Sequence, residues 1–518
     1  MFLLTFIFLA SLSVCLVWEI VIVYLRWHFN YWRKRGVCGP QPYLLVGTFP
    51  KASAGQCNLL EELNEIYLDF LYSRYRVSQK FVGIFIARTP KLFICDPKLA
   101  LEILTQHFKS FHDNESSEWT NANVEQLRPC SPFVSTGEEW KARRSELVPA
   151  LTINKIRSFY SAMRDSAQKA IEFLTAMGEQ PQDAKELANR FTAQFMCNFI
   201  WGIEGNAFNV PQKASATSLS PVHCMARDII LQSLQCVRYY GSTAAWPWLR
   251  KLQPVRFFPV AADRFFQQLL ADALNARAKQ QTAEAGGGRG DVIDHLQQLR
   301  EKKSLNAIQI AGHTTTVLID GYETGAMLIA HCLLLLARNP RVQRKLREEL
   351  LAADVADSFD ALNELPYLEQ CLQETLRLFP PLPTLFKLCT ESVTLKNFDD
   401  STLTVHPGDG VYISTYSFHR DAEYFENPDD FWPERFAEEM GGVRKYREMG
   451  VFMPFGDGPR MCPGMKLGLS EAKVAVSELI SNFKVSAGVE TRTDNKIAND
   501  SFLLTLDGKI ELLFHRRQ

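Results

Sequence analysis

The stretch Phe452 to Gly464, FMPFGDGPRMCPG, decides how this chain of 518 residues is interpreted. Its glycines permit a tight loop, and Cys462 stands just before a run with helical character from Met465 to Phe483. Pro463 suits the first turn of that helix. A cysteine in this place meets free backbone N–H groups and the positive end of the helix dipole, which lower a thiol pKa. The pattern therefore predicts an anionic sulfur ligand at Cys462.

The same loop resembles the F-x-x-G-x-R-x-C-x-G signature of the cytochromes P-450, with Phe455, Gly458, Arg460, Cys462 and Gly464 at the five fixed positions. The resemblance implies haem b (iron protoporphyrin IX), with Cys462 as the axial thiolate and the iron ligand. It also implies that Phe455 packs near the sulfur, Arg460 contacts a haem propionate and Gly464 lets the backbone approach the porphyrin. Such a thiolate pushes electron density toward iron and assists O–O cleavage. The alternative is an ordinary buried cysteine in a loop of glycines and prolines.

Two further segments match the family in the expected order. Residues 374–377, ETLR, resemble its E-x-x-R helix, and residues 431–436, FWPERF, resemble its P-E-R-F segment. Alone, an E-x-x-R would be weak, because it is a common pair on helix surfaces. The resemblance implies a buried ion network of Glu374, Arg377 and Arg435.

Three more side chains are expected at the haem propionates. Trp140 and Arg144 repeat the family's W-x-x-x-R helix and lie one turn apart on a single face. Lys387 stands where relatives usually carry an arginine that binds a propionate. Lysine keeps the charge but loses the planar fork of the guanidinium.

A long apolar segment, Ile308 to Ala337, predicts a helix through the middle of the core. Residues 311–316 (AGHTTT) and 320–325 (DGYETG) compete for the family's [AG]-G-x-[DE]-T-[TS] motif, and the first lacks the acid. Spacing to the downstream helices favours the second, so Glu323 and Thr324 are expected as a catalytic acid–alcohol pair that relays protons.

The chosen motif departs from the family at two positions. Asp320 replaces the usual small residue, and Gly325 replaces a hydroxyl residue. A buried Asp320 on the substrate side would favour a basic substrate, whereas one that faces solvent or a polar neighbour would not.

The N-terminus predicts a membrane anchor. From Phe2 to Leu25 the chain is apolar except for Glu19 and a few hydroxyls, and as a helix it would span about 36 Å against a hydrocarbon core of about 30 Å. No Lys or Arg precedes this run, and four follow it between Arg26 and Arg35, which places the rest of the chain in the cytoplasm. A cleaved signal peptide is the alternative, but it normally carries its positive charge first. Trp27, Tyr31 and Trp32 would suit the membrane interface.

Short β-rich runs at residues 81–86 and 91–95, split by a turn around Arg88 to Pro90, predict a hairpin, and residues 97–351 are mainly helical in pattern. Residues 284–290 predict a flexible connection. The aromatic and basic region from Ala244 to Phe266 would either touch the membrane or form an ordinary amphipathic helix pair.

We expect a mainly α protein with a small β subdomain, the cytochrome P-450 fold. A single catalytic domain (43–518) would follow an anchor (1–26) and a basic, proline-rich linker (27–42). The resemblance covers essentially the whole chain and is strongest to the microsomal enzymes of insects.

Composition narrows the function further. The 57 basic residues nearly cancel the 58 acidic ones, which makes nucleic acid an unlikely partner. Twelve cysteines without a C-x-x-C pair predict reduced thiols.

The resemblance implies a monooxygenase of the endoplasmic reticulum membrane (microsomal), with its catalytic domain on the cytoplasmic side. It would insert one atom of O₂ into a lipophilic small molecule, an endogenous lipid or hormone or a xenobiotic. Electrons would come from NADPH through a flavoprotein reductase, with cytochrome b5 as an optional second donor. A haem-thiolate isomerase or dehydratase and a non-catalytic haem or ligand carrier remain alternatives.

Overall fold

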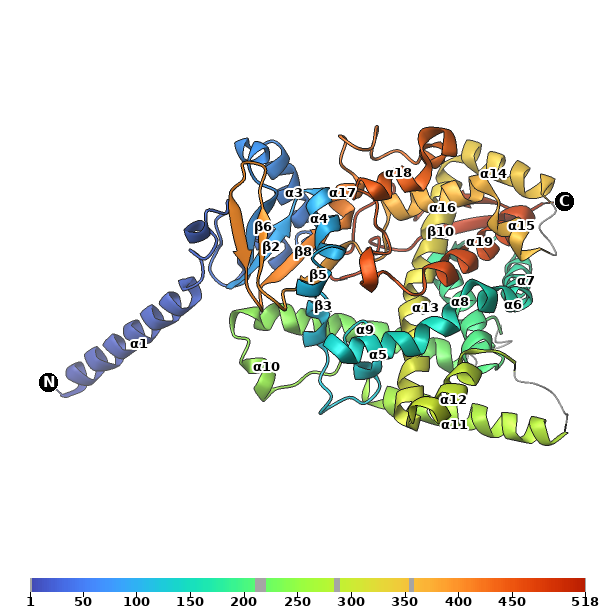
Figure 1. Ribbon diagram of the computed structural model, residues 1–518, viewed down its shortest axis with the longest axis horizontal. Coiled ribbons are helices and arrows are strands. Elements are labelled where there is room, and N and C mark those ends of the chain that lie inside the picture. Colours follow the sequence, from blue (N-terminus) through green and yellow to red (C-terminus); the bar gives the residue numbers. More distant parts are fainter. Residues whose placement is uncertain (1, 210–219, 284–288, 354–357, 518) are drawn as a thin grey trace.

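The computed structural model describes residues 2–209, 220–283, 289–353 and 358–517. Figure 1 shows a body built mostly of helices, a smaller region of strands on the side nearer the N-terminus, and α1 projecting away from both. The expected mainly α fold with a small β subdomain is confirmed.

The helices and strands of the described residues follow one another in a fixed order along the chain. The α-helices are α1 (Phe2–Arg26), α2 (Pro50–Ser53), α3 (Leu59–Leu71), α4 (Pro97–Leu104), α5 (Gly137–Leu147), α6 (Ile153–Ser158), α7 (Tyr160–Met177), α8 (Ala184–Trp201), α9 (Pro221–Ser242), α10 (Leu249–Leu252), α11 (Val260–Ala283), α12 (Val292–Lys303), α13 (Ala307–Arg338), α14 (Pro340–Ala352), α15 (Phe359–Asn363), α16 (Pro366–Leu378), α17 (Thr415–His419), α18 (Gly442–Glu448) and α19 (Met465–Asn482). The strands are β1 (Phe81–Ile86), β2 (Thr89–Ile94), β3 (Asp113–Asn114), β4 (Gln182–Asp183), β5 (Thr384–Leu388), β6 (Val393–Lys396), β7 (Thr402–Val405), β8 (Gly410–Ser414), β9 (Phe483–Ala487) and β10 (Glu511–Arg516).

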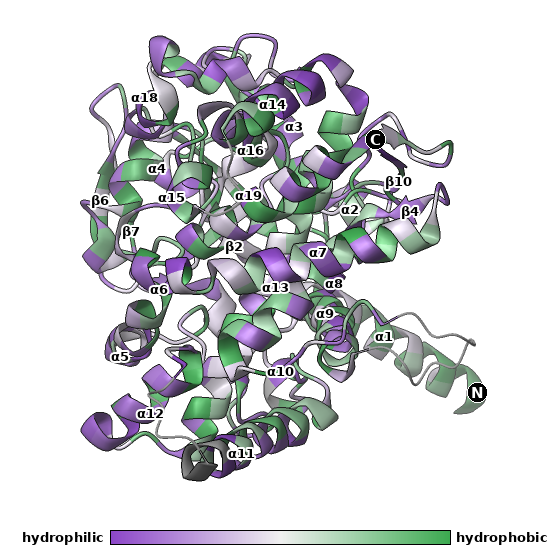
Figure 2. Ribbon diagram, turned by 90° about the vertical axis from the view of Figure 1, so that its right-hand side faces the viewer, coloured by the Kyte–Doolittle hydropathy of each residue, from purple (hydrophilic) through white to green (hydrophobic). Residues whose placement is uncertain are grey.

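Helix α1 is long and apolar enough to cross a membrane, and its hydrophobic side chains are exposed along almost its whole length. Figure 2 shows it as a hydrophobic ribbon, in contrast to the strongly polar α12 and α14. An exposed apolar helix is unstable in water but stable in the hydrocarbon core of a bilayer. This helix therefore suggests membrane anchoring.

The expectation that Trp32 lies at the membrane interface is wrong, whereas the same expectation for the half-buried Tyr31 stays a prediction. Trp32 is only 3% exposed, and its indole packs on Gly83 of β1 and donates to the carbonyl of Ile84 at 3.2 Å. Tyr31 donates its hydroxyl to Asp409 at 2.7 Å. The absence of a side chain at Gly83 leaves the space that the indole fills. Of the three aromatic residues, only Trp27 is exposed.

The predicted hairpin is confirmed, with β1 and β2 antiparallel and a turn at Ala87 and Arg88. It forms one edge of a five-stranded sheet in the order β1-β2-β8-β5-β3. Strand β2 pairs with β8 in parallel, and the two-residue β3 pairs with β5 so that Asn114 lies opposite Lys387. The sheet thereby fixes the position of Lys387.

The predicted core helix is confirmed as α13, which begins at the capping box of Asn306 and Gln309. Nearly all of its residues are buried, and it packs against α8, α19 and α16. Figure 1 shows it running through the helical part of the molecule. A helix that is apolar on most sides is stable in such a place because all its faces are covered.

Glu374, Arg377 and Arg435 form a buried ion network, as expected. Arg377 on α16 makes two hydrogen bonds of 2.8 Å to the carboxylate of Glu374, and both side chains are fully buried. Arg435 approaches the same carboxylate at 3.4 Å. Arg377 also donates to the carbonyl oxygens of His419 and Pro428 at 2.8 and 2.7 Å. These bonds satisfy charges that would otherwise be costly to bury.

The region from Ala244 to Phe266 is only partly the exposed aromatic surface that its composition suggests. Phe257, Phe258 and Phe266 are buried in the core, whereas Trp248 is 52% exposed. Ala244 and Ala245 pack against Leu25 at the end of α1. The surface next to the anchor is therefore limited to a few side chains around α10. The flexible connection expected at 284–290 lies largely outside the described residues.

We predict that Glu374→Gln destabilises the folded protein by about 3–5 kcal/mol, because it leaves two buried guanidinium groups without their shared carboxylate. The matched control is Glu65→Gln, which removes an exposed ion pair with Lys51 and should cost less than about 1 kcal/mol. Chemical denaturation of both variants measures the difference. Equal stability of the two variants would contradict this role of the network.

Candidate functional site

A cavity of about 340 Å³ lies between α13, α5, β5 and the cysteine loop. All nine of the site residues predicted from the sequence line it: Trp140, Arg144, Glu323, Thr324, Lys387, Phe455, Arg460, Cys462 and Gly464. They come from four segments that are far apart in the chain. The fold thus brings one thiol, several cations and the acid–alcohol pair to the same enclosed space.

The loop that carries Cys462 depends on two glycines. Gly456 and Gly458 have φ angles of 69° and 68°, which side chains rarely adopt. A Cβ at residue 458 would also lie 1.9 Å from the carbonyl oxygen of Leu104. Cys462 N–H donates to the carbonyl of Phe455 at 2.9 Å, which closes the loop just before α19 begins at Met465.

The expected lowering of the Cys462 pKa is wrong for the protein chain alone. Burial raises the pKa of this thiol to about 11, although the backbone N–H groups of Gly464 and Met465 act in the opposite direction. The position of the helix start is as expected, but the loss of solvent around the sulfur raises the pKa by more than the N–H groups at the helix start lower it. A metal cation at the sulfur would reverse this balance, because it deprotonates a thiol that coordinates it.

Arg460 holds the cysteine loop to the opposite wall of the cavity. Its guanidinium donates to the carbonyls of His112, Pro132 and Ser135 at 2.6 to 2.8 Å and to Asp113 at 3.2 Å. Four of its five N–H donors are thus used, which leaves one for a ligand. Burial lowers its pKa to about 10.

Lys387 and Arg144 are the cations with more capacity for a ligand. The Lys387 ammonium is 3% exposed and donates to the Asn114 side chain at 2.9 Å. Burial, with a smaller contribution from Arg460, lowers the Lys387 pKa to about 7. Arg144 donates to the Met461 carbonyl at 2.9 Å, and burial lowers its pKa. Both groups would gain stability from an anion in the cavity.

The residues present fit haem. A thiol at one wall can ligate iron, and three cations, the half-buried Arg144 and the buried side chains of Lys387 and Arg460, match the two carboxylates of a porphyrin. A Cβ at residue 464 would lie 3.8 Å from the Cys462 sulfur, an ordinary van der Waals contact, so the glycine leaves open space next to that atom. The lining is otherwise mostly apolar, as a macrocycle requires.

Glu323 and Thr324 occupy one turn of α13 on the cavity wall. The Glu323 carboxylate is buried and bonded to Lys185 Nζ on α8 at 2.6 Å, and Lys185 is 29% exposed. The Thr324 hydroxyl donates to the carbonyl of Asp320 at 2.7 Å and keeps its lone pairs free to accept a proton donor. In the competing stretch, Thr314 and Thr315 are fully buried and donate to Ala311, away from this cavity.

Asp320 faces the cavity rather than bulk solvent, and its polar neighbour is Arg128, with 3.8 Å between Oδ1 and Nη1. Burial raises the pKa of Asp320, and Arg128 lowers it in part. The Asp320 charge also contributes to the raised pKa of Cys462, so the two side chains share this space.

Sequence reasoning missed several polar residues of the cavity, of which Arg128 and Glu471 are both ionisable and buried. Arg128 lies in a short 3₁₀ turn, residues 128–130, that no motif marks. Glu471 on α19 is 1% exposed, and neither carboxylate oxygen has a partner among the described residues. Its burial raises the pKa to about 8. From the sequence alone, Glu471 would be predicted to be an ordinary surface residue of the helix.

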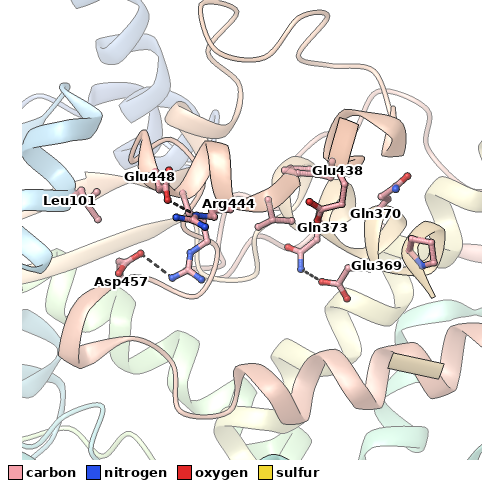
Figure 3. Close-up of a pocket in the computed structure, with 12 residues that line it drawn as sticks. Leu101, Glu369, Gln370, Gln373, Glu438, Arg444, Glu448 and Asp457 are labelled. Atoms are coloured by element: carbon pink, nitrogen blue, oxygen red, sulfur yellow. Dashed lines mark hydrogen bonds and ion pairs between the residues drawn. The ribbon is translucent and has the colours of Figure 1, made fainter. Parts of the chain in front are cut away.

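A second hollow of about 660 Å³ lies behind the cysteine loop, at α16 and α18 (Figure 3). Its charged side chains satisfy one another, as Arg447 with Asp457 at 3.2 Å and Arg444 with Glu448 at 2.6 Å. Cys462 does not line it. It is therefore a polar surface groove and not the candidate active site.

Comparisons with known proteins agree with this geometry. The model of the family described as "Cytochrome P450" matches residues 39–514. Among curated proteins, the chain is 34% identical to "Probable cytochrome P450 28d1" of Drosophila melanogaster, over 98% of this chain and 99% of that protein. It is 36% identical to "Probable cytochrome P450 28a5" of the same species, over 97% and 98% of the two chains. The chain therefore belongs to the cytochrome P450 family and is an oxygen-incorporating haem-thiolate oxidoreductase.

Proposed function

We propose that this protein is a membrane-anchored monooxygenase that inserts one atom of O₂ into a lipophilic small molecule. Electrons come from NADPH through a membrane-bound flavoprotein reductase, with cytochrome b5 as an optional second donor. The observation that carries the proposal is the single cavity that has Cys462 at one wall and Glu323 with Thr324 on α13 at another. The largely apolar lining suits a lipophilic substrate.

In this proposal haem b, when bound, supplies the chemistry of O₂ reduction and oxygen insertion. Cys462 ligates its iron, and Trp140, Arg144, Lys387 and Arg460 hold its propionates. Phe455 packs beside the sulfur, and Gly464 leaves room for the macrocycle.

Glu323 and Thr324 deliver the protons that O₂ reduction consumes. Lys185 is in part exposed to solvent and is bonded to Glu323, which itself reaches the cavity. Protons would therefore enter through Lys185, reach the carboxylate of Glu323 and pass to the Thr324 hydroxyl. General acid catalysis needs donors placed in this way beside the reacting atoms.

The proposed organisation is an anchor (1–26), a linker (27–42) and a catalytic domain (43–518) on the cytoplasmic side of the endoplasmic reticulum membrane. The apolar α1 and the cluster of basic residues after it support this orientation. An isomerase or dehydratase would not need the pair of Glu323 and Thr324. A carrier without catalytic activity would not need that pair, and it would not need the ion pair of Glu323 with Lys185. These features favour the monooxygenase.

Thr324→Ala should leave haem and substrate binding intact but lower the yield of oxygenated product per NADPH by about 10-fold or more, with added hydrogen peroxide. The reason is the loss of the hydroxyl that passes protons on. The matched control is Thr315→Ala, because that hydroxyl is buried away from the cavity. Uncoupling by Thr315→Ala and not by Thr324→Ala would overturn the assignment, and product formation without NADPH would favour an isomerase.

Lys387→Met should speed the loss of haem to apomyoglobin about 10-fold to 100-fold, because a charge-assisted hydrogen bond to a propionate contributes about 1.5–3 kcal/mol. Lys387→Arg, which keeps the charge, is the control.

A pKa of about 7 in the folded chain, below the value of about 10.4 for free lysine, means that the charged ammonium of Lys387 lowers the stability of the haem-free protein. The loss of stability is largest below pH 7, where Lys387 is charged in both the folded and the unfolded chain. It disappears above pH about 10.4, where the group is neutral in both.

The haem-free Lys387→Met protein should therefore be at least as stable as the wild type at pH 6. Unchanged haem loss in this variant, or a parallel loss of stability in the haem-free protein, would contradict the role of Lys387 at a propionate.

A further inference from the structure

Arg128 is a buried cation whose donors are largely unused. It is 3% exposed, yet no hydrogen bond of its guanidinium is found among the described residues, and its Nε is fully enclosed without a partner. The guanidinium lies 4.4 Å from the ring centre of Phe257, and the nearest carboxylate, that of Asp320, is 3.8 Å away. A buried donor without an acceptor normally destabilises the folded protein. This is an arrangement that a ligand would stabilise.

Asp320 presents a matching acceptor to the same space. Its side chain is 46% exposed, and that surface faces the cavity, because the carboxylate lies inside the protein and lines the same space as Cys462. No hydrogen bond to its carboxylate is found within the described ranges. At 3.8 Å, Arg128 and Asp320 attract one another but form no hydrogen bond, so both retain their capacity for a third group.

The surroundings of this pair are apolar. Phe133 and Phe257 lie against the Arg128 guanidinium, and aliphatic and aromatic side chains such as Ile230, Val317 and Phe502 line the same cavity. A few polar groups in an apolar pocket are the usual means by which a protein orients one end of a lipophilic ligand.

The charges around the pair exclude ionic ligands. An anion at Arg128 would face the carboxylate of Asp320 and also that of Glu125, which is 1% exposed and accepts hydrogen bonds from the N–H groups of Phe257 and Phe258 at 3.1 Å. A cation at Asp320 would face the guanidinium of Arg128. The remaining class is an uncharged group that accepts one hydrogen bond and donates another.

We propose that Arg128 and Asp320 form a recognition site for a neutral hydroxyl or amide group on an otherwise lipophilic substrate. The group accepts from the Arg128 guanidinium and donates to the Asp320 carboxylate, and so bridges the gap between them. This assignment rests on the proposed function, since it names the substrate class of the same cavity. Both are specificity-determining residues that touch substrate but take no part in proton delivery.

The test uses the haem-loaded, full-length protein and four ligands with one ten-carbon chain: decan-1-ol, its methyl ether, decanoate and decyltrimethylammonium. Dissociation constants come from isothermal titration calorimetry. We expect decan-1-ol to bind about 10-fold more tightly than the ether, which keeps the acceptor and loses the donor, because one hydrogen bond contributes about 1 kcal/mol or somewhat more. Both ionic ligands should bind more weakly than the alcohol.

Variants assign the two halves of the site. Asp320→Ala should bind the alcohol and the ether equally well, whereas Arg128→Met should weaken both. Ser233→Ala is the matched control, because Ser233 also lines the cavity but donates its hydroxyl to the Ile230 carbonyl. It should keep the wild-type preference. If Arg128→Met does not fold, the binding of the alcohol and the ether to Asp320→Ala still tests the inference. The Asp320 side chain borders the open cavity, so its removal leaves no packing gap.

In the wild type, the inference would be overturned if decan-1-ol did not bind, if it bound no more tightly than its methyl ether, or if either ionic ligand bound more tightly than the alcohol. In Asp320→Ala, it would be overturned if the preference for the alcohol over the ether stayed unchanged. A purely structural ion pair would lower the unfolding temperature of Asp320→Ala without changing ligand preference, which also contradicts it. The proposed function is tested separately by NADPH-dependent oxygenation with a reductase. Oxygenation without the alcohol preference refutes the recognition site alone, and the preference without oxygenation refutes the monooxygenase alone.

Discussion

The buried pair of Glu374 and Arg377 is the interaction on which the rest of the site depends. Arg377 passes its hydrogen bonds to the carbonyl of His419, and the His419 ring accepts from the backbone N–H of Met453 at 3.1 Å. Met453 lies at the start of the loop that carries Cys462, nine residues before that cysteine. Burial and nearby guanidinium groups lower the His419 pKa to about 3, so this ring remains a neutral acceptor at all ordinary pH values. A charged network thus fixes an uncharged chain of contacts that ends at the start of the cysteine loop.

Arg460 fixes the other end of the same loop. Its four hydrogen bonds reach residues 112–113 and the segment 132–135, and so tie the loop to the wall that carries Lys387 and Asn114. The ring of Trp140 covers the guanidinium at 4.5 Å. Position and electrostatics are therefore coupled: the arginine that holds the loop also makes this part of the cavity positive. A planar dianionic ligand matches that combination.

Short, chemically specific patterns were predictable from the sequence. The loop around Cys462, the hairpin at β1 and β2 and the core helix α13 follow from glycines, β-rich runs and an unbroken apolar segment, each of which is local. The nine site residues were found through motifs, and the cavity that they share depends on long-range packing that no motif describes.

The failures have a common physical cause, since burial cannot be read from residue type alone. Trp32 was expected at a membrane, but Gly83, 51 residues away, supplies a space for it. For the region from Ala244 to Phe266 the sequence left a membrane contact and an ordinary helix pair both open, and only the structure shows that Phe257 and Phe258 are buried. The Cys462 pKa depends on how completely solvent is excluded, which outweighs the helix start that the sequence shows. Lys185 and Arg128 have no motif, because their roles arise only from their contacts with α13.

The central claim is that Cys462 is the thiolate ligand of haem iron. The most direct measurement is the absorption spectrum of the reduced, carbon-monoxide-bound protein, for the wild type, for Cys462→Ser and for Cys224→Ser as a control at a half-buried thiol elsewhere. We expect the thiolate-type Soret band in the wild type and in Cys224→Ser and its loss in Cys462→Ser, because a serine oxygen does not replace the electron-rich sulfur on iron. An unchanged thiolate band in Cys462→Ser would place the ligand elsewhere and contradict the account.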